Sequence, residues 1–229
     1  MKTNFLKIFF ALSIILATTA CNSDKTTYTE ESYICFATLT ELTDSGCTFT
    51  VQENNESPEG TLVANMSLDK NLYKEGDRYV IVYTTGGRPA YSSGNINLLQ
   101  ILSAVTGNIQ EVPSEDIAQL TADPINVEYS EQVGKWLNIR ALAPYLSTIK
   151  NCGLYVDEST LGKQYPDVYL GFKSDNTGSL NYRTVYASFD VTSLFGLSGV
   201  HGFTFHYINN GKWQTKRFMK SVKEITPAK

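Results

Sequence analysis

The sequence predicts an all-β protein with two β domains, and three of its features support this prediction. Short runs rich in Val, Ile, Tyr, Phe and Thr recur between Gly, Asn, Asp and Pro residues, as strands recur between turns. Apolar and polar residues alternate within the runs, so that over residues 185–191 the odd positions are expected to face a core and the even positions water. The runs form a group of five and a group of seven, separated near residue 111.

The strands are expected in order along the chain. The first group is 33–41, 47–53, 61–67, 78–85 and 95–102, and the second is 125–129, 134–142, 150–156, 167–173, 183–191, 200–208 and 213–221. Residues 43–46 predict a turn between the first two strands, and Asn209-Asn210-Gly211 predicts a tight hairpin turn between the last two. A short helix is expected at 113–121, because Pro113-Ser114-Glu115-Asp116 is a typical helix start.

The first 21 residues have the features of an export signal. Lys2 and Lys7 give a positive start, and residues 8–16 form an apolar core that is too short for a permanent membrane helix. The small residues before Cys21 resemble a bacterial lipoprotein box, although Thr18 stands where Leu is commonest. We therefore expect a signal peptide over residues 1–20, a lipid on Cys21 and a flexible tether over residues 21–32. The alternative is an ordinary secretory signal that is cut nearby.

The length and charge of the mature chain limit its organisation and its partners. Without residues 1–20 it is long enough for one large or two small domains, and we expect β domains over residues 33–111 and 112–229. Loss of Lys2 and Lys7 reduces the 19 basic residues to 17, against 23 acidic residues, so the net charge is near −6. This charge argues against a nucleic-acid partner, since such binding needs basic patches. It also leaves the lipid itself as the attachment to the membrane.

Three cysteines besides Cys21 belong to the mature chain: Cys35, Cys47 and Cys152. An oxidising compartment would permit a disulfide between Cys35 and Cys47. In the predicted hairpin, however, Cys47 lies opposite residue 42 or 43, which leaves Cys35 roughly 20–25 Å further along its strand. Buried free thiols are therefore the expectation, while the sequence leaves a disulfide open. No spacing of Cys and His residues indicates a metal site.

Histidine is scarce, which limits the catalytic chemistry of the chain. His201 and His206 are five residues apart in a predicted strand, so we expect them on opposite faces, with His201 pointing inward. The sequence contains no zinc-hydrolase motif, no Gly-x-Ser-x-Gly elbow and no phosphate loop, and its paired carboxylates lie in predicted turns or in the tether. We therefore expect no catalytic residue, no metal and no cofactor, in a protein that is not an enzyme.

Aromatic residues outside the predicted core mark a candidate binding surface. Trp136 and Arg140 share a parity opposite to that of the apolar positions between them, so both are expected on the outer face of their strand. Such residues often act as contact hot spots. A Trp136 that points inward at a strand edge is the alternative. Tyr182 and Tyr186 share the solvent side of their own strand and would extend the same patch.

Five segments together resemble one protein family. Residues 75–83, Glu-Gly-Asp-Arg-Tyr-Val-Ile-Val-Tyr, are similar to the GDRV-x-V-x-Y strand of the NigD-like lipoproteins of Bacteroidales. Residues 123–127, 136–140, 168–172 and 187–191 follow in the order that this family shows. The resemblance covers essentially the whole mature chain, and it depends on the order of the strand patterns together with the lipoprotein signal.

The resemblance implies an N-terminal OB-like barrel followed by a C-terminal antiparallel β-sandwich, which agrees with groups of five and seven strands. The family takes its name from a bacteriocin-associated operon, and its members are called candidate immunity proteins for that reason. It has no established catalytic residues, so none is carried over to this chain. The acidic run that commonly directs Bacteroidota lipoproteins to the cell surface is absent after Cys21, which leaves a periplasm-facing position open.

These observations lead to three hypotheses for a lipid-anchored protein of the cell envelope, expected at the outer membrane on its periplasmic or surface face. The first is a non-enzymatic protein that binds an envelope or secreted protein or peptide, as a bacteriocin immunity protein would. The second is a glycan-binding accessory lipoprotein in which Trp136, Trp213 and exposed tyrosines stack on sugar rings. The third is a structural subunit of an envelope complex.

Overall fold

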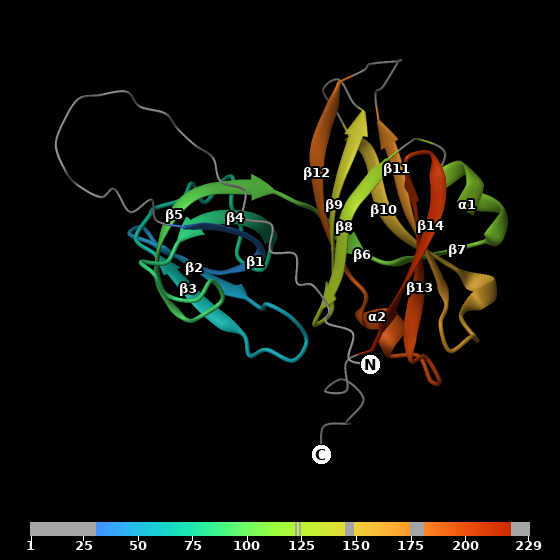
Figure 1. The fold of residues 1–229 in the computed structure, drawn as a ribbon, viewed down its shortest axis with the longest axis horizontal. Helices are drawn as coiled ribbons and strands as arrows, with labels where there is room; N and C mark the ends of the chain where they lie inside the picture. The colour runs from blue at the N-terminus through green and yellow to red at the C-terminus, as the bar shows by residue number, and fades with distance from the viewer. Residues whose placement is uncertain (1–30, 122, 124, 145–148, 175–180, 221–229) are drawn as a thin grey trace, which may run out of the picture.

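The computed structural model describes residues 31–121, 123, 125–144, 149–174 and 181–220. It consists of a small β-barrel beside a β-sandwich, and the chain passes from one to the other between β5 and β6 (Figure 1). The predicted all-β class, with an OB-like barrel followed by a sandwich, is confirmed. The expected signal peptide and Cys21 lie outside the described residues.

Five strands close the barrel in the order β1-β2-β3-β5-β4, which is compatible with an OB fold. They are β1 (Ser32–Leu42), β2 (Cys47–Val51), β3 (Gly60–Ala64), β4 (Arg78–Thr84) and β5 (Gly94–Ser103). The predicted turn at 43–46 is present, because the backbone N–H of Thr43 donates to the carbonyl oxygen of Gly46 at 2.9 Å. Each of the five predicted strands of the first group is therefore found close to its expected place.

Two sheets form the sandwich, in the orders β14-β13-β11-β10-β7 and β6-β12-β9-β8. The strands are β6 (Val105–Asn108), β7 (Gln110–Val112), β8 (Asn126–Val133), β9 (Trp136–Pro144), β10 (Ile149–Asp157), β11 (Asp167–Ser174), β12 (Tyr182–Asp190), β13 (Gly202–Asn209) and β14 (Lys212–Met219). Most neighbouring strands are antiparallel, but β7 with β10, β6 with β12 and β11 with β13 are parallel pairs. The sandwich is therefore mixed rather than purely antiparallel.

Within the described ranges, three short helices accompany the strands. The predicted helix is confirmed as α1 (Ser114–Leu120), whereas the 3₁₀ helix η1 (Glu158–Thr160) and α2 (Thr192–Phe195) were not expected. Helix α1 packs on β10 and β11. Over the ranges that the structure describes, no helix is long and apolar enough to cross a membrane.

The barrel and the sandwich have separate hydrophobic cores. The barrel core contains the fully buried side chains of Phe49 and Tyr83. The sandwich core lies between its two sheets, where Phe189, Phe203 and Phe205 are fully buried. These inward phenylalanines confirm the alternation predicted for β12 and β13. Each part therefore contains the apolar contacts that stabilise a domain.

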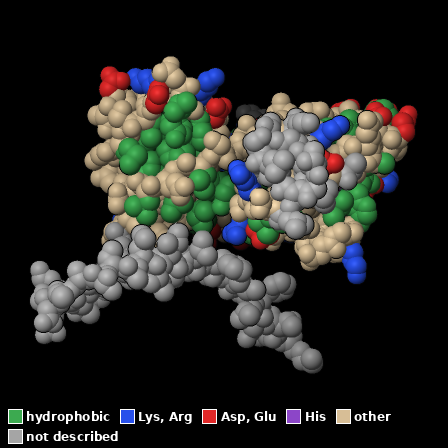
Figure 2. All heavy atoms as spheres, turned by 90° about the horizontal axis from the view of Figure 1, so that it is seen from above, with side chains coloured by type: hydrophobic (Ala, Val, Ile, Leu, Met, Phe, Trp, Pro, Cys, Tyr) green, Lys and Arg blue, Asp and Glu red, His purple; other side chains and the backbone are tan. Residues whose placement is uncertain are grey.

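The surface of the barrel also carries hydrophobic side chains. Seen from above in Figure 2, they gather over part of the barrel, while several charged side chains lie at its margin. Ile34 of β1 and Leu99 of β5 are among the exposed hydrophobic residues, at 40% and 51%. An apolar contribution to the surface is ordinary in folded proteins.

Cys35, Cys47 and Cys152 are free thiols in the structure. Cys47 pairs with Leu42 across the β1–β2 ladder, as the hairpin predicts. Cys35 and Cys47 belong to the barrel core and Cys152 packs against the sandwich core. Burial raises the pKa of Cys35 to about 12, because an apolar surrounding disfavours the thiolate. The expectation of buried thiols is therefore confirmed for Cys35 and Cys47, whereas Cys152 is only partly buried.

The sheet that contains β13 and β14 ends in a tight hairpin. Asn210 and Gly211 have positive φ angles of 50° and 70°, as a type I′ turn requires. The predicted turn at residues 209–211 is therefore present. Strand β14 comes last in the sheet order, and most of its side chains are exposed. Its outer backbone edge thus has no partner strand among the described residues.

Candidate interdomain site

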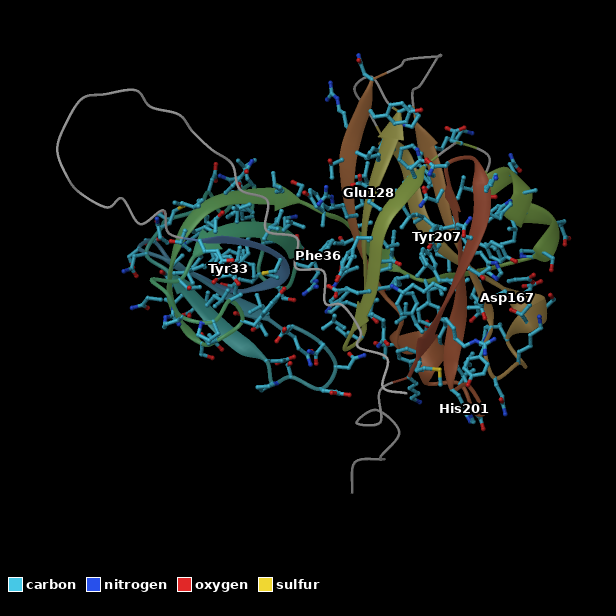
Figure 3. The ribbon with its side chains drawn as sticks, viewed as in Figure 1. Tyr33, Phe36, Glu128, Asp167, His201 and Tyr207 are labelled. Carbon is cyan, nitrogen blue, oxygen red and sulfur yellow. The ribbon has the colours of Figure 1, made fainter. Side chains whose placement is uncertain are left out.

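The candidate functional site lies where the barrel meets the sheet β6-β12-β9-β8. Strands β8, β9 and β12 form the side of the sandwich that is next to the barrel (Figure 1). Phe36 of β1 lies at this boundary (Figure 3), and its ring meets that of Tyr186 of β12 edge-on, with the centroids 6.1 Å apart. The outer face of this sheet is therefore partly in contact with the barrel and partly open to solvent.

All four residues of the predicted binding surface lie on this outer face. Arg140 of β9 and Tyr186 of β12 are cross-strand partners, and Trp136 and Tyr182 have the same parity in their strands. Tyr182 is 55% exposed, whereas Trp136 is partly buried beside the barrel. The structure thus brings the four residues onto one sheet face, and their role in binding stays a prediction.

Strand β8 adds three residues to this face that the sequence did not reveal. Tyr129 is the cross-strand partner of Arg140 and is 48% exposed. Its hydroxyl donates a short hydrogen bond to the carboxylate of Glu131. Arg140 Nε lies 3.0 Å from Glu128 Oε2, as an ion pair without the alignment of a hydrogen bond. We refer to Trp136, Arg140, Tyr182, Tyr186 and Tyr129 as the contact face.

Arg78 joins the barrel to the sandwich at the inner end of the contact face. Its side chain is almost fully buried, with 7% of the residue exposed. Nε donates to Ser188 Oγ at 3.2 Å, Nη2 to Asn138 Oδ1 at 3.0 Å and Nη1 to Thr38 Oγ1 at 3.1 Å. Two of these acceptors belong to the sandwich and one to the barrel, so one guanidinium group bonds both domains.

The charge of Arg78 is balanced only at longer range. In the part of the chain that the structure describes, no carboxylate forms an ion pair with it. Burial lowers the pKa of Arg78 to about 10, which leaves the guanidinium charged at neutral pH. Burial raises the pKa of the nearby Glu131, against hydrogen bonds from Tyr129 and Asn138 that act in the opposite direction. Asn138 thus connects the buried cation to the buried acid.

The ring of Trp136 lies close to two cations. Arg78 Cζ is 5.0 Å from the ring centroid and Lys135 Nζ is 4.7 Å from it. Lys135 also forms an ion pair with Asp190 at 2.9 Å. Cations near an indole face are attracted by its quadrupole, more strongly where water is excluded. These contacts fix Trp136 at the boundary rather than leaving it as a free surface side chain.

A loop of the barrel forms hydrogen bonds with the turn between β8 and β9. Asn55 Nδ2 donates to the carbonyl oxygen of Gln132 at 3.2 Å, and the backbone N–H of Gly134 donates to Asn55 Oδ1 at 2.6 Å. Gly134 has a positive φ of 54°, which suits glycine at this turn. The Asn55 contacts and the Arg78 contacts therefore hold the two domains together at separate points.

A pocket of about 50 Å³ opens between these two points of contact. Arg78, Trp136 and Asn138 line it, with Phe36 and Thr38 from β1. A second hollow of about 440 Å³ lies on the barrel beside Tyr33, Pro58, Pro89 and Tyr91. The smaller pocket is the one that combines a buried charge with an aromatic wall.

The opposite sheet of the sandwich carries a second aromatic cluster on its outer face. The rings of Tyr169 and His206 stack with centroids 4.5 Å apart, and Trp213 meets Tyr169 edge-on at 6.0 Å. His206 Nε2 lies 2.8 Å from Asp167 Oδ1, and Asp167 lies on the side of the sandwich away from the barrel (Figure 3). The cluster is thus separate from the contact face.

One sequence expectation about histidine is wrong. His201 does not point into the core: it precedes β13, is exposed, and meets the ring of Tyr165 edge-on with centroids 6.5 Å apart. The strand begins only at Gly202, so the alternation that places Phe203 inward does not extend to His201. Across the described residues, no group of three His, Cys, Asp or Glu side chains is placed to hold a metal ion.

Comparisons with known proteins identify the fold. No protein-family model and no curated protein matches the chain. A protein of unknown function from Bacteroides vulgatus has 16% sequence identity and a TM-score of 0.63, over 83% of this chain and 92% of that chain. A NigD-like immunity protein from Bacteroides caccae has 12% identity and a TM-score of 0.58, over 83% and 97%.

A third solved structure extends this likeness. A candidate lipoprotein from Bacteroides fragilis has 10% identity and a TM-score of 0.57, over 84% of this chain and 100% of that chain. Identities this low establish the fold alone. The two-domain fold of this chain is thus the fold of a NigD-like protein, and the resemblance predicted from the sequence is confirmed at that level.

Proposed function

We propose that this chain is a non-enzymatic, lipid-anchored protein of the cell envelope that binds a protein or peptide through the contact face. The observation that carries the proposal is the gathering of Tyr129, Arg140 and Tyr182 in an exposed position on one sheet face. Tyrosine and arginine are enriched among the residues that dominate protein interfaces. A sheet held against a second domain presents them with little freedom to rearrange, which lowers the entropic cost of binding.

The partner that we propose is a secreted bacteriocin, which would make the chain an immunity protein anchored through Cys21 at the outer membrane. The fold shared with a NigD-like immunity protein supports this version, and the fold shared with a candidate lipoprotein supports the envelope location. An immunity protein that occupies the toxin or shields the target of the toxin needs no catalytic group. The contact face supplies aromatic and charged groups for such a contact.

A capture experiment tests the binding function. The mature chain with Cys21→Ser serves as bait for envelope extract and culture supernatant, and mass spectrometry identifies what is retained. We expect one protein or peptide to be retained by the wild-type face and lost with Tyr129→Ala/Tyr182→Ala. Trp213→Ala, which removes a similarly exposed aromatic residue from the opposite sheet, is the matched control and should keep the partner. Equal retention by all three baits would exclude the contact face.

The immunity role is tested in the species that carries the gene for this chain. A deletion strain should be more sensitive than its parent to bacteriocins of neighbouring strains, and the wild-type gene should restore resistance. Restoration by the Tyr129→Ala/Tyr182→Ala variant should fail. Unchanged sensitivity of the deletion strain would remove the immunity role and leave a structural subunit of an envelope complex as the protein-binding alternative.

One observation favours glycan binding as a second candidate function. Trp213 is 51% exposed and lies against Tyr169 on the outer face of the other sheet, and exposed aromatic rings of this kind can stack on sugars. On a glycan array, this hypothesis expects binding that Trp213→Ala abolishes. Binding that survives both Trp213→Ala and Trp136→Ala, or no binding at all, would contradict it.

A further inference from the structure

We propose that the pocket between the barrel and the sandwich binds a carboxylate group, which pairs with the guanidinium of Arg78 beside the ring of Trp136. The proposal rests on the proposed binding function, because the pocket lies at the barrel end of the contact face. It adds the chemical class of the group that enters there. The carboxylate belongs either to a small organic acid or to an acidic side chain of a bound peptide.

The donor geometry of Arg78 is the first observation that supports a carboxylate site. A guanidinium group has five N–H donors, and the structure gives Nε, Nη1 and Nη2 one acceptor each. Two N–H groups, one on each terminal nitrogen, therefore have no acceptor assigned among the described residues. Arg78 also lines the pocket. A carboxylate is the group that best matches a guanidinium, since its two oxygens can accept two parallel N–H bonds.

The missing counter-charge of the Arg78 guanidinium is the second observation that supports a carboxylate site. Arg78 is 7% exposed and its three assigned acceptors, on Ser188, Asn138 and Thr38, are all neutral. A buried charge without a paired opposite charge is costly. Glu131 does not fill this role directly, because its carboxylate accepts from Tyr129 and Asn138 instead. An anion that enters the pocket would supply the contact charge that the described residues do not.

The size and wall of the pocket select the anion. A volume of about 50 Å³ holds a few water molecules or one small polar group, which suits a carboxylate better than a large ligand. Glu59 also lines the pocket, from an exposed position. Its negative charge disfavours a dianion such as phosphate more than a monoanion. The small volume and the nearby negative charge together favour one carboxylate over a larger ligand or a dianion.

The chain offers a direct readout for this proposal, since it contains only two tryptophans. In the full mature protein with Trp213→Phe, the tryptophan fluorescence comes from Trp136 alone. We would titrate this protein with sodium acetate at pH 7, with sodium chloride at matched ionic strength as the reference. A blocked Gly-Asp-Gly peptide forms the second arm. A saturable change with acetate or peptide, absent with chloride, is the expected result.

Three variants decide whether the signal comes from the pocket. Thr50 lines the pocket without bonding Arg78, so Thr50→Met should block the pocket and abolish the change. Thr61→Met, at the cross-strand partner of Thr50 outside the pocket, is the matched control and should leave the change intact. Glu59→Gln should tighten acetate binding about two- to tenfold, because it removes a nearby like charge.

The outcomes distinguish a small organic acid from an acidic side chain of a peptide. They also test the carboxylate site separately from the proposed binding function. Saturation by acetate alone identifies a small acid, whereas saturation by the peptide identifies an acidic side chain of a partner. No saturable change in either arm, or the same change in Thr50→Met, would overturn the carboxylate site. That result would leave the capture experiment untouched, since loss of a partner with Tyr129→Ala/Tyr182→Ala does not depend on acetate binding.

Discussion

Arg78 illustrates how a single side chain can set the stability of the boundary between two domains. Arg78→Ala removes three hydrogen bonds from a buried cation and leaves the acceptors Ser188 Oγ, Asn138 Oδ1 and Thr38 Oγ1 without their donor. We expect the free energy of unfolding to fall by about 2–4 kcal/mol in urea titrations, because buried polar groups that lose a charged partner are costly.

Arg217 provides the control for this prediction. It is exposed, and its guanidinium carbon lies 4.3 Å from the centroid of the Tyr165 ring. An exposed cation–π contact contributes about 0.5–1 kcal/mol, so Arg217→Ala should cost no more than that. Equal losses for the two variants would contradict the role assigned to the bonds of Arg78.

Glu131 is expected to make stability depend on pH. Burial raises its pKa in the folded protein above the ordinary value of 4.5. The contribution of Glu131 to stability is therefore fully present below that value and decreases as the pH rises through the higher folded pKa. The unfolding free energy of Glu131→Gln, relative to wild type, should accordingly increase between about pH 4 and pH 7.

Chemical denaturation at a series of pH values measures this difference. Glu56→Gln, at an exposed position of the barrel loop, controls for the general effect of removing one negative charge. A relative stability of Glu131→Gln that falls with rising pH would show that the hydrogen bonds from Tyr129 and Asn138 outweigh the burial of the carboxylate.

At the scale of elements, the packing of α1 on β10 and β11 depends on a glycine. A Cβ added to Gly171 would lie 2.4 Å from the Tyr155 ring and 2.8 Å from the carbonyl oxygen of Leu120 at the end of α1. Gly171→Ala should therefore displace α1, with a cost of about 1–3 kcal/mol. Hydrogen exchange should show faster amide exchange in α1.

Gly162→Ala is the matched control for this prediction. A Cβ at Gly162 meets no atom within 4 Å, and its backbone does not need a positive φ. We expect its stability to stay within about 0.5 kcal/mol of wild type. Unchanged exchange of α1 in Gly171→Ala would show that the helix does not depend on this close approach.

The strands that the sequence predicted share a property that the missed strands lack. Alternating apolar residues identify β12 and β13, whose phenylalanines fill the sandwich core. Strands β6 (Val105–Asn108) and β7 (Gln110–Val112) are short and polar, and they exist only because they pair in parallel with distant strands. Local sequence carries no signal for such pairings, since tertiary context decides them.

A β-bulge explains why Tyr129 escaped the sequence prediction of the site. The register of β8 on β9 shifts between Val127 and Tyr129, which reverses the parity of the strand beyond the bulge. Trp136 and Arg140 lie in a regular strand, so their face was predictable from alternation. Arg78 was missed for a different reason, because its acceptors on Ser188 and Asn138 are 110 and 60 residues away.

At the scale of the whole molecule, two cores are joined by a few polar contacts. The barrel and sandwich cores are separate, and Arg78 and Asn55 carry hydrogen bonds across the boundary. Arg78→Ala/Asn55→Ala should therefore uncouple the domains. In calorimetry, we expect one transition for wild type and two for the double variant, since domains with independent cores unfold separately once their interface is lost.

A proteolysis experiment complements the calorimetry. After brief protease treatment, the double variant should yield one domain-sized fragment that remains folded, while wild type resists. The double variant Leu99→Ala/Arg217→Ala, which changes two exposed residues away from the boundary contacts, serves as the reference. A single calorimetric transition in Arg78→Ala/Asn55→Ala would show that apolar contacts such as Phe36 with Tyr186 suffice to couple the domains.

The open edge of β14 has a consequence for the self-association of the protein. A strand edge without a partner is a template on which another copy of the same chain could add its own strand. Strand β14 carries Lys212, Lys216 and Arg217 within eight residues. Two such edges brought together would place like charges side by side, and this repulsion opposes self-association into aggregates. The positive charge of β14 therefore favours a protein that remains dispersed even at high local concentration.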